Sequence, residues 1–243
     1  MKKIIAVIPA RYQSSRFPGK PLAMILGKPM IQRVYERVRA VDLLMDVIVA
    51  TDDKRIRQEV ERFGGHAVMT GVCACGTERV YQAACHTDAD IIINVQGDEP
   101  LIHGEMIREL AGVFEDDTLV MATLKKKVEN NAEVMQDNIV KVVTDRYGDA
   151  LYFSRSPVPY DRDCAGAIYY KHIGIYGYTK AFLQKYVQLP ESELESAEKL
   201  EQLRVLENGY KIRVKETVYD TFGVDLPEQI LKAEAELRNR NEE

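Results

Sequence analysis

The sequence lacks long hydrophobic runs and is poor in cysteine, and each absence excludes a class of protein. None of its apolar stretches approaches the roughly 18 residues that a membrane-spanning helix requires. The apolar run Ile4–Ile8 is short and is soon followed by Arg11, which is unlike a signal peptide. We therefore expect a cytoplasmic protein without membrane contacts, in which the four cysteines are reduced.

Several common motifs are also missing. The chain has no G-x-x-x-x-G-K-[ST] and no G-x-G-x-x-G, so neither a Walker-type phosphate loop nor a dinucleotide-dependent oxidoreductase is indicated. Cys73 and Cys75 form a C-x-C without a second pair at zinc-binding spacing, which gives a structural zinc site little support.

The chain has no excess of basic residues. Thirty-three Lys and Arg stand against 38 Asp and Glu, and a net charge of −5 argues against nucleic acid or an anionic membrane as a partner. A hydrophobic fraction of 46% is typical of a globular protein, and 243 residues suffice for one large α/β domain or a domain with an insertion.

The most informative stretch is a loop that follows the first apolar run. Ile4–Ile8 is typical of a buried strand, and Arg11, Arg16 and Lys20 come after it among Ser, Gly and Pro residues. Small residues let backbone N–H groups approach an anion, and guanidinium groups bind phosphate oxygens through two hydrogen bonds. The loop therefore indicates a polyphosphate site, the alternative being a surface loop whose cations are merely solvated.

Alternating strands and helices predict the fold. Strands are expected at 4–8, 46–53, 66–69 and 90–95, and helices at 29–39 and 54–63. This alternation is typical of βαβ units with right-handed crossovers. We expect an α/β fold with a mostly parallel, Rossmann-like sheet and helices on both faces.

Asp98 follows the strand at 90–95, in the sequence Gln96–Pro100. Ligands in open α/β sheets bind outside the carboxyl ends of the strands, so Asp98 should lie on the same rim as the basic loop. A carboxylate opposite three cations suits a triphosphate bridged by Mg²⁺. A strand-end Asp that caps the next helix is the alternative, and Glu99 is expected to support the site or the structure.

The pattern changes after about residue 118. A strand at 118–124 precedes Lys125–Lys127, which we interpret as a solvated face. The remaining expected elements are strands at 139–144, 150–153, 168–178 and 211–215, a polar loop at 156–167, one helix at 196–206 and a last helix from Leu226, for which Asp225 is a natural N-cap. We divide the chain into a core that carries the phosphate loop, at 1–124 and 216–243, and an inserted subdomain with antiparallel character at 125–215, which we expect to supply an acceptor pocket and a dimer surface.

Motifs spread over nearly the whole chain carry a resemblance to a known family. They are I-P-A-R-Y-x-S-S-R-x-P-G-K-P, K-P-M-I-Q, V-A-T-D-D, N-V-Q-G-D-E-P, A-L-Y-F-S-R-S, K-H-I-G-I-Y-G-Y, L-E-Q-L-R-V-L and G-V-D-x-P-E. In these the chain resembles the CMP-Kdo synthetases, the 3-deoxy-manno-octulosonate cytidylyltransferases. The resemblance implies a cytoplasmic homodimer that uses Mg²⁺ to transfer CMP from CTP to the anomeric hydroxyl of Kdo, an acidic eight-carbon sugar, with release of pyrophosphate. The product would serve lipopolysaccharide or capsule synthesis.

The resemblance also implies roles for individual residues. The catalytic set is Arg11, Lys20, Asp98 and Asp225, the last two as metal ligands. The nucleotide-binding residues are Ala10, Arg11, Ser14, Ser15, Arg16, Lys20, Gly76 and Thr77. The sugar-binding residues are Arg79, Gln96, Arg155, His172, Tyr176, Glu201 and Gln202. A structural imidazole at His172 and a packing role for Tyr176 stay open as alternatives.

The chain departs from the family pattern in one segment. Where the family reads D-H-x-S-G-T-[DE]-R, this chain has Val72-Cys73-Ala74-Cys75 before Gly76, so that the Asp-His pair is absent and Cys75 stands in place of the serine. The departure leaves two alternatives open. The acceptor could be another acidic sugar, such as 8-amino-Kdo or a sialic acid, or the chain could be a catalytically weakened nucleotide-binding protein.

Overall fold

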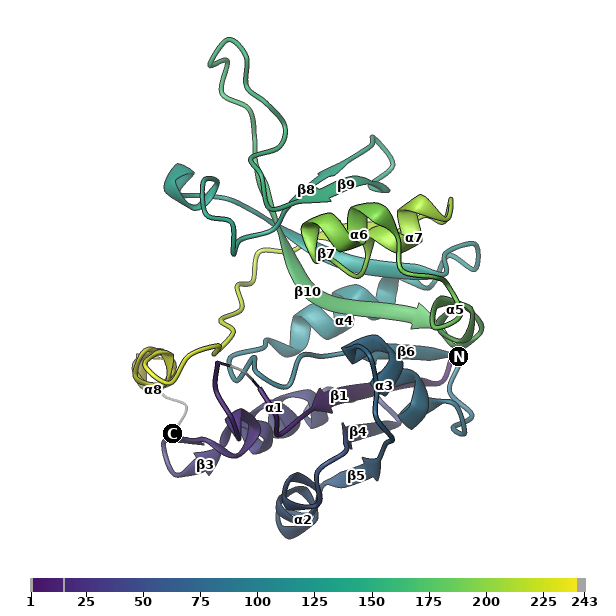
Figure 1. Cartoon of the computed structure of the whole chain (residues 1–243), viewed down its shortest axis with the longest axis vertical. Coiled ribbons are helices and arrows are strands. Elements are labelled where there is room, and N and C mark those ends of the chain that lie inside the picture. Colours follow the sequence, from purple (N-terminus) through teal and green to yellow (C-terminus); the bar gives the residue numbers. More distant parts are fainter. Residues whose placement is uncertain (1, 15, 240–243) are drawn as a thin grey trace. The chain divides into compact units, whose positions relative to one another are not determined.

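The chain divides into two compact units in a computed structural model that describes residues 2–14 and 16–239. Unit 1 comprises Met1–Arg108 and Asp220–Glu243, and unit 2 comprises Glu109–Tyr219 (Figure 1). Unit 1 is therefore built from two separate parts of the sequence. Among the described residues, no helix is both long and apolar enough to cross a membrane.

Unit 1 contains a parallel sheet with the strand order β6-β1-β4-β5. Its strands are β1 (Ile4–Ala10), β4 (Asp46–Thr51), β5 (His66–Met69) and β6 (Ile91–Asn94). The connecting helices are α1 (Met30–Arg39), α2 (Lys54–Arg62) and α3 (Gly76–Ala84), and Figure 1 shows α3 in front of β1 and α1 behind it. The prediction of a mostly parallel α/β sheet with helices on both faces is confirmed.

The hydrophobic periodicity of the sequence accounts for these elements. The central residues of β1, from Ile5 to Ile8, are fully buried, as a strand covered on both faces requires. Helix α1 buries Met30, Ile31, Val34, Tyr35 and Val38, the apolar stripe of an amphipathic helix.

The second part of unit 1 completes its core. Helix α8 (Gln229–Asn239) buries Ala233 and Leu237 in one cluster with Ile25, Met30 and Leu101. The short elements between β1 and α1 are η1 (Lys20–Leu22), β2 (Met24–Ile25) and β3 (Lys28–Pro29). Residues from both parts of the sequence thus share one hydrophobic cluster.

Unit 2 is built around antiparallel strands. Strand β10 (Tyr170–Thr179) pairs with β7 (Met121–Lys127) and with β8 (Lys141–Thr144), and β8 pairs with β9 (Ala150–Ser154). Strand β11 (Arg213–Glu216) runs parallel to β7. The other elements are α4 (Gly104–Val113), which spans the division between the units, and η2 (Asn131–Glu133), α5 (Lys180–Tyr186), α6 (Glu193–Glu198) and α7 (Leu203–Glu207).

The structure corrects the interpretation of Lys125–Lys127 as a solvated face at Lys125, whereas Lys127 is exposed. These residues form the end of β7, which begins at Met121 rather than at 118. Lys125 is half-buried, donates to Thr144 Oγ1 at 2.7 Å and lies 4.2 Å from the centre of the Tyr170 ring. Burial lowers the pKa of Lys125. The three lysines looked like a solvated face because their strand partners are far away in the sequence.

Two predicted helices are also corrected. The single helix expected at 196–206 is two helices, because Lys199 takes the left-handed conformation (φ 53°) and ends α6. The last helix begins at Gln229 rather than at Leu226, and the Gln229 side chain accepts hydrogen bonds from the backbone N–H groups of Asp225 and Leu226.

Candidate functional site

The basic loop after β1 closes on itself through Gly19. Gly19 has a φ of 73° and its N–H donates to Tyr12 O at 2.8 Å. This left-handed conformation favours glycine. The Arg55 guanidinium stacks 3.3 Å from the centre of the Tyr12 ring and pairs with Asp53 at 2.7 Å, so α2 supports the loop from outside.

Two carboxylates and two cations of the predicted site meet in unit 1. Lys20 Nζ lies 2.5 Å from Asp98 Oδ2 and 3.3 Å from Asp225 Oδ1. Arg16 Nη2 lies 3.1 Å from the same Asp225 oxygen. The Lys20 side chain is only 14% exposed while Arg16 is 63% exposed, so Lys20 is the more firmly held of the two. Arg11 is exposed on the same loop.

Backbone contacts fix the two carboxylates, which we call the carboxylate pair, relative to each other. The N–H of Val224 donates to Asp98 O at 2.9 Å, which joins the segment of Asp225 to the segment after β6. Gly97 permits a close approach between β6 and β1, because a Cβ there would lie 2.8 Å from Pro9 O. Asp98 and Asp225 are distant in sequence but lie on one short stretch of hydrogen-bonded backbone.

Glu99 lies beside the carboxylate pair and is buried. Burial and the neighbouring Asp98 raise the pKa of Glu99 to about 8. Its Oε1 accepts from the Thr221 hydroxyl at 3.4 Å. This setting agrees with the supporting role that the sequence indicated for Glu99.

The carboxylate pair fits a divalent cation, as the position of Lys20 shows. The described residues contain no group of three or more His, Cys, Asp or Glu side chains that could hold a metal ion. Mg²⁺ commonly takes only one or two carboxylates and completes its octahedron with water and substrate phosphates. The Lys20 ammonium between Asp98 and Asp225 shows that positive charge is favoured between them.

The other predicted nucleotide contacts are at the carboxyl ends of β1 and β5. Ala10 is the last residue of β1, and Ser14 Oγ accepts from Phe17 N at 3.4 Å. Gly76 and Thr77 begin α3, with Thr77 buried. Ser15 lies outside the described residues.

Arg79 is already paired inside unit 1. It is buried on α3, and its guanidinium donates to Asp52 Oδ2 at 2.7 Å and to Thr70 Oγ1 at 2.5 Å. These partners follow β4 and β5, so Arg79 ties α3 to the ends of two strands. Gln96, the other sugar contact predicted in unit 1, is half-buried after β6.

The segment that departs from the family pattern lies between β5 and α3. Val72 is 95% exposed, and Cys75 is the N-cap of α3 but makes no side-chain capping hydrogen bond. The backbone of Gly71 and of Ala74 is held by Gln82 and Glu78 at 2.9 and 2.7 Å. All four cysteines are free thiols.

In unit 2, His172 and Tyr176 lie within an aromatic row on β10. The His172 ring centre is 5.0 Å from that of Phe153 and 5.3 Å from that of Tyr176, which in turn stacks on Tyr178. His172 Nε2 lies 2.9 Å from Thr123 Oγ1. Burial lowers the pKa of His172 to about 3, so its imidazole is neutral at pH 7.

Arg155 is held by backbone oxygens. Its Nε donates to Glu198 O at 2.8 Å and its Nη1 to Asp137 O at 2.9 Å. The Glu198 carboxylate instead accepts from Ser154 Oγ at 2.6 Å and from the Arg155 backbone N–H at 2.9 Å. Lys141, fully buried, donates to Arg155 O and to two further carbonyl oxygens. The guanidinium is therefore fixed in place by neutral acceptors.

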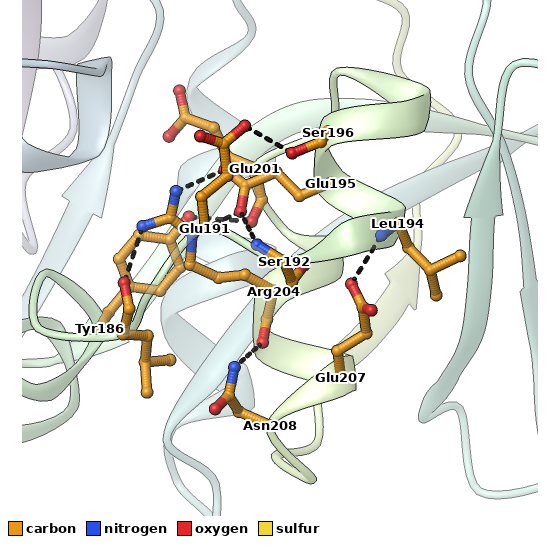
Figure 2. A network of polar contacts seen from close by, with 11 residues as sticks. Tyr186, Glu191, Ser192, Leu194, Glu195, Ser196, Glu201, Arg204, Glu207 and Asn208 are labelled. Carbon is orange, nitrogen blue, oxygen red and sulfur yellow. Dashed lines mark hydrogen bonds and ion pairs between the residues drawn. The ribbon is translucent and has the colours of Figure 1, made fainter.

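Glu201 and Gln202 lie in the turn between α6 and α7, next to a polar network (Figure 2). Tyr186 donates from its hydroxyl to Glu201 O at 3.1 Å, and Arg204 binds the Glu195 carboxylate through two hydrogen bonds of 2.5 and 2.6 Å. Gln202 is buried, and its Nε2 has no hydrogen-bond partner among the described residues.

Comparison with known proteins identifies the family. A family model described as cytidylyltransferase matches residues 5–212. The 3-deoxy-manno-octulosonate cytidylyltransferase of Geobacter metallireducens is 50% identical, over 95% of this chain and 96% of that protein. That of Syntrophotalea carbinolica is 53% identical, over 97% of this chain and 98% of that protein. This chain belongs to the 3-deoxy-manno-octulosonate cytidylyltransferase family.

Solved structures agree with this membership in the 3-deoxy-manno-octulosonate cytidylyltransferase family. A CMP:2-keto-3-deoxy-manno-octonic acid synthetase complexed with CTP matches with a TM-score of 0.94 and 48% identity, over 98% of this chain and 99% of the other. A 4-diphosphocytidyl-2C-methyl-D-erythritol synthase from Anaerococcus prevotii shares the fold, with a TM-score of 0.66 at 16% identity, over 98% of this chain and 99% of the other.

Sequence reasoning missed several residues that support the candidate site of this cytidylyltransferase. Arg55, Lys141 and Glu198 hold the residues of the predicted site without belonging to any motif. Only Lys141 left a signal, since it is a lone lysine between Val140 and Val142 in an apolar strand.

Proposed function

We propose that this chain is a nucleotidyltransferase that transfers CMP from CTP to the anomeric hydroxyl of Kdo and releases pyrophosphate. The observation that carries this proposal is the position of Lys20 between Asp98 and Asp225, beside Arg16. The same family membership that relates the chain to Kdo cytidylyltransferases supports CTP and Kdo as its substrates.

We further propose that Asp98 and Asp225 hold Mg²⁺ together with the triphosphate. When bound there, Mg²⁺ supplies neutralisation of the phosphate charge and increased acidity of a bound hydroxyl. The carboxylate pair supports this assignment, because two carboxylates beside a triphosphate carry more negative charge than the single charge of Lys20 offsets.

The cations of the basic loop have a separate task. Arg16 and Lys20 bind phosphate oxygens and stabilise the negative charge that develops on the leaving pyrophosphate, and Arg11 on the same loop acts with them. Little covalent chemistry falls to the protein in such a displacement at phosphorus. Orientation of the reactants alone supplies up to about 7–11 kcal/mol in favourable cases.

For the sugar, we propose Arg155, His172, Tyr176, Glu201 and Gln202, which all belong to unit 2. Two observations support the set. The Arg155 guanidinium donates to two carbonyl oxygens, which leave its positive charge in place for the sugar carboxylate. The buried Gln202 Nε2 is a donor that a sugar hydroxyl would satisfy. Arg79 remains a candidate contact, although Asp52 already pairs with it.

We also propose that the enzyme acts as a homodimer in the cytoplasm. Resemblance to the CMP-Kdo synthetases supports both statements. Sedimentation at micromolar concentration tests the dimer, and a monomer with full activity would contradict it.

Pyrophosphate release tests the reaction. We expect release from CTP and Mg²⁺ with Kdo, and not with UTP in place of CTP. Reactions with 8-amino-Kdo and with a sialic acid run in parallel. Pyrophosphate release with only one of these sugars would identify that sugar, and not Kdo, as the acceptor. No release in any reaction while CTP still binds would favour a weakened nucleotide-binding protein.

The carboxylate pair gives a sharper test of the mechanism. We expect Asp98→Asn and Asp225→Asn each to lower kcat by about 10²–10³-fold, the loss typical when a group that stabilises the transition-state charge is removed. Asp42→Asn is the matched control, because Asp42 is an exposed carboxylate of unit 1 that pairs only with Arg108 among the described residues. Wild-type activity in Asp225→Asn would rule out its metal role.

A further inference from the structure

A bulge in β10 brings two carbonyl oxygens to one threonine. The antiparallel pairing of β10 with β7 is interrupted between Ile173, which faces Leu124, and Tyr176, which faces Thr123. The register of β10 against β7 therefore shifts between Ile173 and Tyr176, as in a β-bulge. Thr123 Oγ1 lies 3.1 Å from Ile173 O and 2.7 Å from Ile175 O.

The Thr123 hydroxyl has a single proton, and the geometry shows where it points. A separation of 2.7 Å between two oxygens is the ordinary length of an O–H···O hydrogen bond, so the proton lies toward Ile175 O. Thr123 is fully buried. Its oxygen can then only accept from His172 Nε2, which lies 2.9 Å away.

The tautomer of His172 follows from this bond. A neutral imidazole carries one proton, and a donor at Nε2 leaves Nδ1 as an acceptor. The His172 ring lies between those of Phe153 and Tyr176, and its hydrogen bond to Thr123 is made through Nε2. Burial keeps the imidazole neutral.

We propose that Thr123 is a positioning residue that fixes His172 as the Nε2–H tautomer, so that Nδ1 accepts a hydrogen bond from a hydroxyl of the acceptor sugar. The assignment of the acceptor rests on the proposed function, whereas the tautomer does not. His172 thus acts toward the sugar as a hydrogen-bond acceptor and not as a cation or an acid.

The tautomer can be read directly from the free protein. The chain has four histidines, so ¹⁵N-histidine labelling gives a simple spectrum, and His172→Gln assigns the resonances. At pH 7 we expect an unprotonated Nδ1 and a protonated Nε2 at His172. A protonated Nδ1 in the wild-type protein would overturn the proposal.

Substitution of Thr123 tests the positioning role. Thr123→Val removes the hydroxyl at nearly constant shape, and we expect the two tautomers to mix and the KM for Kdo to rise by up to about tenfold, with the KM for CTP unchanged. We expect Thr123→Ser, which keeps the hydroxyl, to show the wild-type His172 tautomer and the wild-type KM for Kdo. Thr144→Val removes a hydroxyl from β8 in the same unit and should move neither. Equal KM values and an unchanged tautomer in Thr123→Val would refute the role.

Two further outcomes are decisive. If Thr123→Val does not fold, Thr123→Cys is used instead, because cysteine keeps the volume of threonine but its sulfur is a much weaker acceptor. The His172 tautomer and the KM for Kdo are then measured in the cysteine variant. The wild-type spectrum could be as expected while no pyrophosphate is released with Kdo. This result would contradict the proposed contact with the sugar but would still support the role of Thr123 in fixing the tautomer. The failure of the proposed function is thereby distinguished from the failure of the positioning role.

Discussion

At the scale of single residues, two arginines of the predicted sugar site differ in their remaining charge. Arg79 is buried against the Asp52 carboxylate at 2.7 Å, so the pair is close to neutral. Arg155 is held by the carbonyl oxygens of Glu198 and Asp137, which leave its charge in place. An anionic sugar is attracted by the second arrangement and much less by the first. The sequence cannot make this distinction, because it shows two arginines and not their partners.

His172 gives a pH dependence of stability. Burial lowers its pKa from 6.5 to about 3, so between these values the unfolded chain binds a proton that the folded chain does not. The free energy of unfolding should therefore fall as the pH is lowered from 6.5 toward 3, with a His172 contribution of at most about 1.4 kcal/mol per pH unit. Urea unfolding at several pH values measures the slope.

The variant His172→Gln isolates this contribution. Its stability should depend less steeply on pH than that of the wild type within the same window, whatever its stability at pH 7. His86→Gln, at an exposed position, controls for the loss of a histidine as such. An identical slope in His172→Gln and the wild type would contradict the assigned pKa shift.

At the scale of elements, helix α3 begins at a residue whose side chain is a poor helix cap. Cys75 is the N-cap, and no side-chain capping hydrogen bond is made there. A serine oxygen accepts from the first-turn N–H groups far better than a thiol does. We expect Cys75→Ser to raise the free energy of unfolding by about 0.5–1 kcal/mol, measured by urea unfolding under reducing conditions.

Cys85 provides the matched control for this prediction. It is the C-cap at the other end of α3, where serine has no comparable amide to bind. Cys85→Ser should therefore give no gain. An equal gain in both variants would show that loss of the thiol, and not capping, is responsible.

Elements were predictable where their cause is local. The strands of unit 1 and helix α1 follow from short periodic patterns, and their predicted positions agree with the structure. The break at Lys199 was not predictable, because the apolar stripe continues through it and a lysine gives no signal for the left-handed conformation found there. The same holds for β7, where Lys125 contacts Thr144 and Tyr170, two residues far away in the sequence.

At the scale of the whole molecule, the second part of unit 1 is needed for its stability. Leu237 on α8 is fully buried in the cluster that contains Ile25 and Met30. We expect Leu237→Ala to lower the free energy of unfolding by about 2–5 kcal/mol, through lost burial and the cavity left behind.

Leu231 lies on the same helix but is 72% exposed, so Leu231→Ala should change stability by less than about 0.5 kcal/mol. Chemical denaturation of both variants makes the comparison. Similar losses would mean that α8 is not packed as described.

Some residues of the candidate site could be predicted from the sequence and others could not. The carboxyl ends of parallel strands share one rim, so the meeting of Lys20 with Asp98 follows from topology. The arrival of Asp225 at the same place depends on a distant segment and was implied only by resemblance. Thr123 left no signal at all, because its role depends on a bulge in a strand far away in the sequence.

The discontinuity of unit 1 also has a consequence for protein synthesis. Ribosomes make Lys20 and Asp98 early, but Asp225 and Leu237 only after the whole of Glu109–Tyr219 has been translated. A nascent chain or a prematurely terminated product therefore lacks both a proposed metal ligand and part of its own core. We therefore expect such a fragment to be degraded by proteases and to have no activity with CTP.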